Sequence, residues 1–183
     1  MWLMDMVFPV EVAEGEEPQG LLLTGDWEGV DPWELLLPDA EIDEETLARI
    51  RDPRKSKIVL AEAVVKLGRE AVLSVIAHEL GHLLLRLYLS EEELEGSWEE
   101  AVVDQGALFV LGLGPLPEPL ATCVRRQNRP PEAFRTWAER HLQWFEEAYG
   151  PLPPMEAPAF QRLIQDIKKH IRVHEEAQKA QEG

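Results

Sequence analysis

The sequence predicts an α+β fold, in which a small N-terminal sheet, mixed or antiparallel, packs on a long apolar helix and is followed by a helical C-terminal part. Three observations support this prediction. Short apolar runs bounded by Gly, Asp and Pro recur in the first 65 residues, as in short strands. Residues 69–89 form a long apolar segment without proline. Beyond residue 120, apolar residues recur at helical spacing.

The N-terminal part predicts strands and one short helix. Residues 2–12 alternate in polarity as a strand does, and an acidic turn follows them. Residues 21–24 and 34–37 are short apolar runs between turn residues, which predicts two further strands. Residues 43–50 predict a short helix. Residues 57–65 are rich in Val, Ile and Leu and predict a strand that ends before the apolar helix.

The apolar segment 69–89 contains the motif His78-Glu79-Leu80-Gly81-His82. In a helix the two imidazoles share one face, so their ring nitrogens can converge on one cation, and Zn²⁺ favours imidazole ligands. Glu79 can reach water at such a cation without binding the cation itself, which is the position of a general base. The alternative is a chance motif with core histidines, but burying these polar groups without partners costs roughly 2–3 kcal/mol each.

A catalytic zinc site needs a third protein ligand. Downstream, Glu100 and Asp104 lie four residues apart at the start of a second apolar segment, so in a helix they share one face. Glu100 is the predicted third ligand, and Asp104 is predicted to accept the outer N–H of a metal-bound histidine. Two alternatives remain open: in one, Glu100 belongs to a capping box with Ser97; in the other, Glu99 or Asp104 is the third ligand.

These motifs resemble those of the gluzincin metallopeptidases, in which an H-E-x-x-H helix is followed by a helix with a glutamate ligand. The chain looks most like small bacterial proteins of the ImmA/IrrE type, whose second motif is matched by Glu100, Asp104 and Ala107 but not by Val103 and Gly106. The resemblance implies a zincin-like fold and zinc-dependent peptide hydrolysis. It also implies that the strand before the motif helix is a sheet edge above the metal, to which an extended peptide substrate could add.

A histidine further along the chain is a second candidate catalytic residue. Residues 128–149 predict a helix, and His141 lies in the middle of its apolar stripe. An inward-facing His141 could donate a proton or stabilise the oxyanion of a tetrahedral intermediate, a role that gluzincins commonly give to a downstream His or Tyr. The alternative is a core histidine bonded to a backbone carbonyl.

The remaining C-terminal elements are predicted from capping and breaking residues. Residues 90–93 form a capping box that starts a helix, and the Gly and Pro residues of 112–120 break the chain. The last helix is predicted over 157–180, with His170 and His174 as a further i, i+4 pair, and the polar residues 175–183 are predicted to be disordered. We therefore expect a zincin-like metal-binding domain over 1–120 and a helical extension over 121–183, packed as one compact unit.

The amino-acid composition disfavours some classes of binding partner and some cellular locations. With 35 acidic and 18 basic residues the net charge is −17, which disfavours binding to nucleic-acid phosphates or to anionic membranes. The single cysteine, Cys123, excludes an intrachain disulfide and fits a reducing compartment. The N-terminus lacks the basic region of a secretion signal, and the longest apolar run carries charged residues. These observations predict a cytoplasmic protein.

The sequence thus predicts a zinc metallopeptidase that acts on a peptide or protein substrate. His78, His82 and Glu100 are the predicted metal ligands, and Glu79 is the predicted general base. A different class of function stays open, a zincin-like regulatory or scaffold module that binds a protein partner without turnover. A structural zinc that joins two helices is a third alternative.

Overall fold

The computed structural model describes residues 3–16, 20–23, 56–94 and 98–182, and over these the fold is α+β, mostly helical with one small sheet. The predicted elements at 34–37 and 43–50 lie outside the described residues. In chain order the elements are the 3-10 helix η1 (Leu3–Asp5), the strands β1 (Val10–Ala13), β2 (Gly20–Leu23) and β3 (Lys57–Ala61), and the helices α2 (Glu62–Leu67), α3 (Arg69–Tyr88), α4 (Glu91–Leu94), α5 (Trp98–Val110), α6 (Glu118–Arg126), α7 (Glu132–Tyr149) and α8 (Ala157–Glu182).

The sheet is mixed, and its strand order over the described residues is β1-β3-β2. Val10 of β1 pairs in parallel with Ile58 of β3, and Leu21 of β2 pairs antiparallel with Val59 of β3. The last four residues of β3 are all buried, as expected for a strand covered on both faces. The prediction that the strand before the motif helix is a sheet edge is therefore wrong, because β3 is the middle strand and β2 lies outside it.

The strand predicted over 57–65 is also too long. It ends at Ala61, and Glu62–Leu67 forms helix α2. The two valines of α2 favour a strand locally, but Val64 is buried in the core from a helical turn, so packing decides over intrinsic preference. Glu62 in the first turn of α2 also suits the positive end of the helix dipole.

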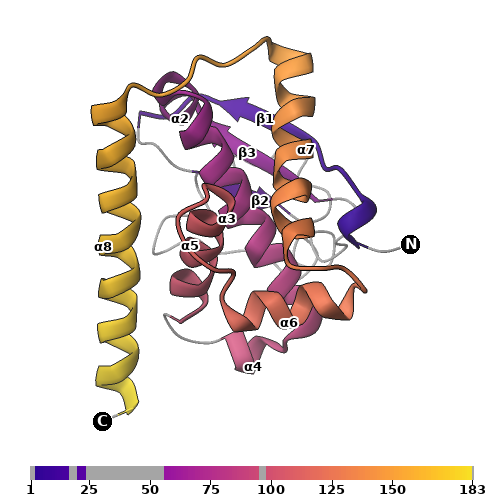
Figure 1. Ribbon diagram of the computed structural model, residues 1–183, viewed down its shortest axis with the longest axis vertical. Helices are drawn as coiled ribbons and strands as arrows, with labels where there is room; N and C mark the ends of the chain where they lie inside the picture. The colour runs from indigo at the N-terminus through magenta and orange to yellow at the C-terminus, as the bar shows by residue number, and fades with distance from the viewer. Residues whose placement is uncertain (1–2, 17–19, 24–55, 95–97, 183) are drawn as a thin grey trace, which may run out of the picture.

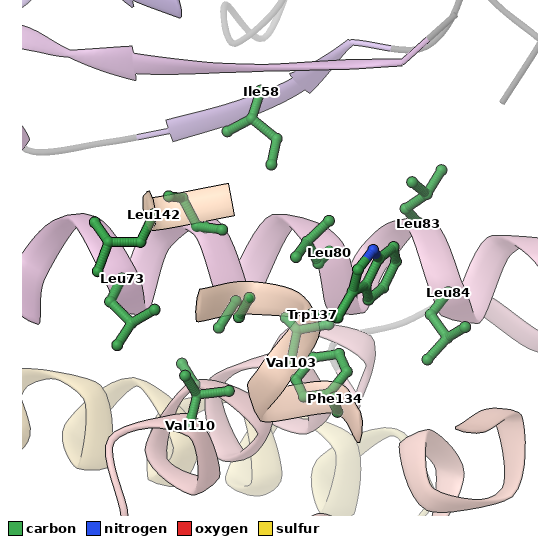
Figure 2. Close-up of a cluster of buried hydrophobic side chains, with 14 of the residues drawn as sticks. Ile58, Leu73, Leu80, Leu83, Leu84, Val103, Val110, Phe134, Trp137 and Leu142 are labelled. Atoms are coloured by element: carbon green, nitrogen blue, oxygen red, sulfur yellow. The ribbon is translucent and has the colours of Figure 1, made fainter. Parts of the chain in front are cut away.

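Helix α3 is the centre of the fold. Most of its residues between Ala71 and Leu85 are buried, on every side of the helix. Figure 2 shows Leu80 and Leu84 of α3 between Ile58 of the sheet on one side and Phe134 of α7 on the other. By length and mean hydropathy, α3 is also the one helix of the described part that could cross a membrane, although most of its apolar stretch is buried within the protein.

Helix α5 packs closely on α3 because the motif glycine allows it. A Cβ atom on Gly81 would lie 2.9 Å from the Cγ1 atom of Val103, so any larger residue would push the two helices apart. Both residues lie in the middle of their helices and face the core. This close approach brings the acidic residues at the start of α5 to the histidine face of α3.

The helices after residue 120 share the core of the first part of the chain. One continuous hydrophobic cluster contains Ile58 and Leu80 from the first part and Phe134 and Trp137 from α7. Helices α6 and α7 pack on α3 on one side, and α8 runs along α5 on the other (Figure 1). The predicted helix over 128–149 starts later, at Glu132, and α6 was not predicted because its nine residues lie in a segment interrupted by prolines.

Helix α8 is attached mainly by three isoleucines. Ile167 and Ile171 pack with Leu108 of α5 in a small cluster separate from the main core, and Ile164 is also buried. The helix continues to Glu182, so the prediction of disorder over 175–183 is wrong as far as that residue. The predicted capping box is confirmed, since the Ser90 N–H donates to Glu93 and the Glu93 N–H donates to the Ser90 hydroxyl.

Candidate metal centre

The two motif histidines and one glutamate converge at the contact of α3 and α5. The Nε2 atoms of His78 and His82, one helical turn apart, are 3.1 Å from each other. From α5, Glu100 places one carboxylate oxygen 3.3 Å from Nε2 of His78 and the other 3.2 Å from Nε2 of His82. The sequence left open whether Glu100 faces the histidines or caps its own helix. Its side chain is directed at the histidines. Ser97, its partner in the predicted capping box, lies outside the described residues.

This group is close enough to bind one metal ion. Ligand atoms 2.0–2.1 Å from a tetrahedral ion lie about 3.3 Å from one another, and the separations within the group are 3.1 to 3.3 Å. The donors are two imidazole nitrogens and carboxylate oxygens, a set that suits divalent transition metals. The residues predicted from the motif spacing, His78, His82 and Glu100, are therefore the ones that the structure brings together.

The outer ring nitrogens of both histidines are held by carboxylates. Nδ1 of His78 is 2.9 Å from Asp104, and Nδ1 of His82 is 2.6 Å from Glu99. Each contact directs the other nitrogen, Nε2, toward the shared site, as the outer partners of metal-binding histidines do. Asp104 was predicted in this position. Glu99 was considered only as a ligand, and its pairing with His82 could have been suspected from the acidic pair at the start of α5.

The acidic surroundings alter the protonation of the group. Burial lowers the pKa of His78, but hydrogen bonds to Asp104 and Glu100 and the charge of Glu79 outweigh it and raise the pKa to about 10. Burial likewise opposes the charged form of His82, while Glu100 and Glu99 raise its pKa overall. Burial raises the pKa of Glu100, but hydrogen bonds to both histidines lower it more. A cation that binds here must therefore displace protons.

Glu79 is placed beside this group but is not part of it. Its side chain is 7 % exposed, and it lines a cavity of about 520 Å³ together with His78 and Asp104. As part of the cavity lining, Glu79 places a carboxylate next to this space. Strand β2 crosses α3 at this point. A Cβ atom on Gly20 would lie 2.2 Å from a methyl of Val75 and 3.6 Å from the Glu79 carboxylate.

His141 is not brought to the metal-ligand group. Its ring is fully buried between Phe8 and Trp137, its Nδ1 donates to the carbonyl of Trp137 at 2.8 Å, and its Nε2 accepts from the N–H of Phe8 at 3.0 Å. Both ring nitrogens are occupied by backbone groups, so neither can act on a substrate. The catalytic assignment of His141 is therefore wrong, and the core alternative holds. Sequence periodicity shows that a histidine faces inward, but not what it meets there.

This burial makes His141 an acid-sensitive part of the fold. Burial lowers the pKa of His141 from 6.5 to about 4, against the weaker raising effect of the Trp137 carbonyl. Between these values the unfolded chain binds a proton that the folded chain does not, so folding free energy is lost as the pH falls from 6.5 toward 4, at about 1.4 kcal/mol per pH unit. Replacing His141 with glutamine is expected to reduce this loss between pH 7.5 and 5.5 by about 1 kcal/mol.

The measurement for His141 is urea unfolding of both proteins at the two pH values. All other titrating groups, including the metal-ligand histidines, are common to the two proteins, so the difference between their pH dependences isolates residue 141. An equal loss of stability in both proteins would show that His141 is protonated in the fold.

Comparison of the chain with protein-family models, with curated proteins and with solved structures finds no match. The resemblance to gluzincins thus rests on the motif residues, and the function has to be argued from the chemistry of the site. The arrangement offers three converging ligands, two carboxylates that orient the histidines, and one further carboxylate on the wall of a cavity.

Proposed function

We propose that this protein is a zinc-dependent peptidase. The observation that carries the proposal is the convergence of His78, His82 and Glu100 next to a cavity on whose wall Glu79 holds a carboxylate that is not a ligand. Three protein ligands and an open side are typical of catalytic zinc sites, whereas structural sites close all four positions with protein side chains. This difference favours a catalytic role over a zinc that only joins α3 to α5.

The donor set supports zinc as the ion. Two imidazoles and a carboxylate are the ligands of a well-known class of zinc hydrolases, and a site without cysteine does not favour softer ions. His78 and His82 each have an outer carboxylate partner, which orients the rings and raises their basicity as ligands. When bound, a zinc ion supplies a Lewis acid that polarises a carbonyl and lowers the pKa of water to about 7.

Glu79 is the residue that moves the proton in this proposal. It follows His78 directly on α3, and its carboxylate faces the cavity that also exposes His78. From there it takes a proton from water as the water oxygen attacks the peptide carbonyl carbon, and it delivers that proton to the amide nitrogen as the bond breaks. Asp104 and Glu99 hold the two rings and take no part in the transfer.

The surroundings of Glu79 support a peptide substrate. Strand β2 is one of the two outer strands of the sheet over the described residues, and it crosses α3 at Gly20, next to Glu79. An extended peptide beside such a strand can form backbone hydrogen bonds along it. The cavity next to Glu79 is lined mainly by apolar side chains and has a volume in the range of ligand pockets, roughly 300–1,000 Å³.

The test is metal-dependent hydrolysis by the full chain. Purified without a histidine tag and supplied with zinc, the protein is expected to bind one zinc ion and to cleave members of a mixed peptide library, with products identified by mass spectrometry. A chelator should abolish cleavage, and zinc, but not magnesium, should restore it. Cleavage that persists in chelator, or a zinc-loaded protein that cleaves no peptide of the library, would contradict the proposal.

A further inference from the structure

The cavity beside Glu79 is a trough along one face of α3. Ala71, Val75 and His78 follow one another along its floor, and Leu67 and Met155 lie at the end away from the metal centre. From Ala71 to His78 the helix rises about 10 Å, which is the length of about three residues of extended peptide. The trough therefore has a metal end, at His78 and Glu79, and a far end at the first turn of α3.

Helix α8 forms a wall of this trough. It begins beside the start of α3, where the Met155 N–H donates to Glu70 at 2.7 Å, and then runs along α5 (Figure 1). Leu163 and Ile167 of α8 face the trough, as do the polar residues Arg162 and Asp166, which are one helical turn apart. Arg162 is in the second turn of α8, so it lies toward the far end of the trough.

The charges along the trough differ between its two ends. Among the described residues that line the trough, Arg162 is the one basic residue apart from the histidines, and it forms no ion pair with another described residue. Glu79, Asp104 and Asp166 are acidic and lie at the metal end or between that end and Arg162. With zinc bound, the ion's two positive charges are exceeded by the carboxylates of Glu79, Glu99, Glu100 and Asp104 around it, so the far end with Arg162 is the more favourable place for an anionic group. A guanidinium that lines this cavity and has no ion-pair partner among the described residues can bind an anionic group of a ligand.

We propose that the trough binds the C-terminal segment of a peptide, with apolar side chains against α3 and α8 and the free α-carboxylate on Arg162. This inference rests on the proposed function and gives its substrate class. The difference in charge between the two ends of the trough sets the direction of the bound peptide. The cleaved bond lies at Glu79, and the C-terminus of the peptide lies at Arg162. The length of the trough then predicts that a fragment of about three residues is removed from the C-terminus.

Binding of a product-like peptide tests the inference separately from catalysis. The probes are the tripeptide Ala-Leu-Leu with a free carboxylate and the same tripeptide as its C-terminal amide. Each is titrated into isotope-labelled, zinc-supplied protein, and the Kd is obtained from NMR chemical shifts. The wild-type protein is expected to bind the free acid about three- to tenfold more tightly than the amide, because an exposed charged hydrogen bond is lost in the amide.

The matched variants are Arg162→Gln and Arg172→Gln, both at exposed positions of α8, of which only Arg162 lines the trough. In Arg162→Gln the free acid and the amide should bind equally, whereas Arg172→Gln should keep the wild-type preference. Equal binding of the two probes by the wild-type protein, a preference that survives in Arg162→Gln, or no binding of either probe at millimolar concentration would overturn the inference.

Hydrolysis distinguishes this inference from the proposed function. Longer peptides ending in Ala-Leu-Leu are offered as free acids and as amides, and the cleavage position is determined by mass spectrometry. Preferential release of the C-terminal fragment from the free acids supports both proposals. Equal cleavage of both forms at internal bonds keeps the peptidase and overturns the role of Arg162. A carboxylate preference in binding, with no cleavage of either form, keeps the binding site and contradicts the peptidase.

Discussion

Replacing Glu79 with glutamine is expected to lower kcat/KM for peptide hydrolysis by about 10²–10⁴-fold, the usual contribution of a positioned general base. Glutamine has nearly the same shape but cannot accept and return the proton. The zinc affinity should change little, because Glu79 faces the cavity and the ligand group consists of His78, His82 and Glu100. The fold should also persist, since glutamine has nearly the same volume as glutamate and also forms hydrogen bonds.

The measurement combines zinc content with steady-state kinetics on a peptide that the wild-type protein cleaves. Glu62→Gln, at an exposed position in the first turn of α2, is the matched control and should keep both zinc and activity. Full activity of Glu79→Gln would show that another group takes the proton. A different outcome is that the wild-type protein binds zinc and a protein partner but hydrolyses no peptide, and that Glu79→Gln still binds the partner. The protein would then be the regulatory or scaffold module without turnover that the sequence also allows.

The second large effect is expected on zinc affinity when His82 is replaced with alanine. Structural zinc sites gain about 10–16 kcal/mol from four ligands, or roughly 3 kcal/mol for each, so the loss of one ligand should weaken binding by at least about 100-fold. Glu99→Gln, which removes only the carboxylate partner of Nδ1 of His82, should weaken binding by about tenfold. The loss of zinc affinity should be larger for His82→Ala than for Glu99→Gln, because His82 binds the metal and Glu99 only orients His82.

These affinities can be measured by competition with a chromophoric chelator at fixed pH, since zinc must displace protons from the site. His170→Ala is the matched control, because this histidine of α8 lines the cavity but is not in the ligand group. Its zinc affinity should equal that of the wild-type protein. An equal affinity of His82→Ala and the wild-type protein would contradict the assigned ligands, and a loss in His170→Ala would place a ligand on α8.

Several features of this protein are determined by residues close together in the sequence. The i, i+4 spacing of His78 and His82 in a proline-free segment puts both imidazoles on one helix face, because the geometry of a helix is the same wherever it packs. The same reasoning predicts that Glu100 and Asp104 share a face of α5, and the reciprocal bonds of Ser90 and Glu93 follow from a four-residue motif.

Other features depend on which elements meet, and local patterns do not contain that information. His141 has the inward position that the sequence predicts, yet it meets the backbone of Phe8 and Trp137 instead of the metal centre. Similarly, Glu99 and Glu100 are adjacent acidic residues, and only the close contact of α3 with α5 makes one the partner of Nδ1 of His82 and the other a ligand.

The sequence by itself thus determined the motif helix, the two histidines and the acidic helix that completes the ligand group. The tertiary structure decided the middle position of β3 in the sheet, the core role of His141 and the wall of the cavity formed by α8. The physical reason is the distance along the chain over which each interaction acts. Helical periodicity and capping act over a few residues, whereas sheet order and the surroundings of a buried side chain depend on contacts between segments far apart in the chain.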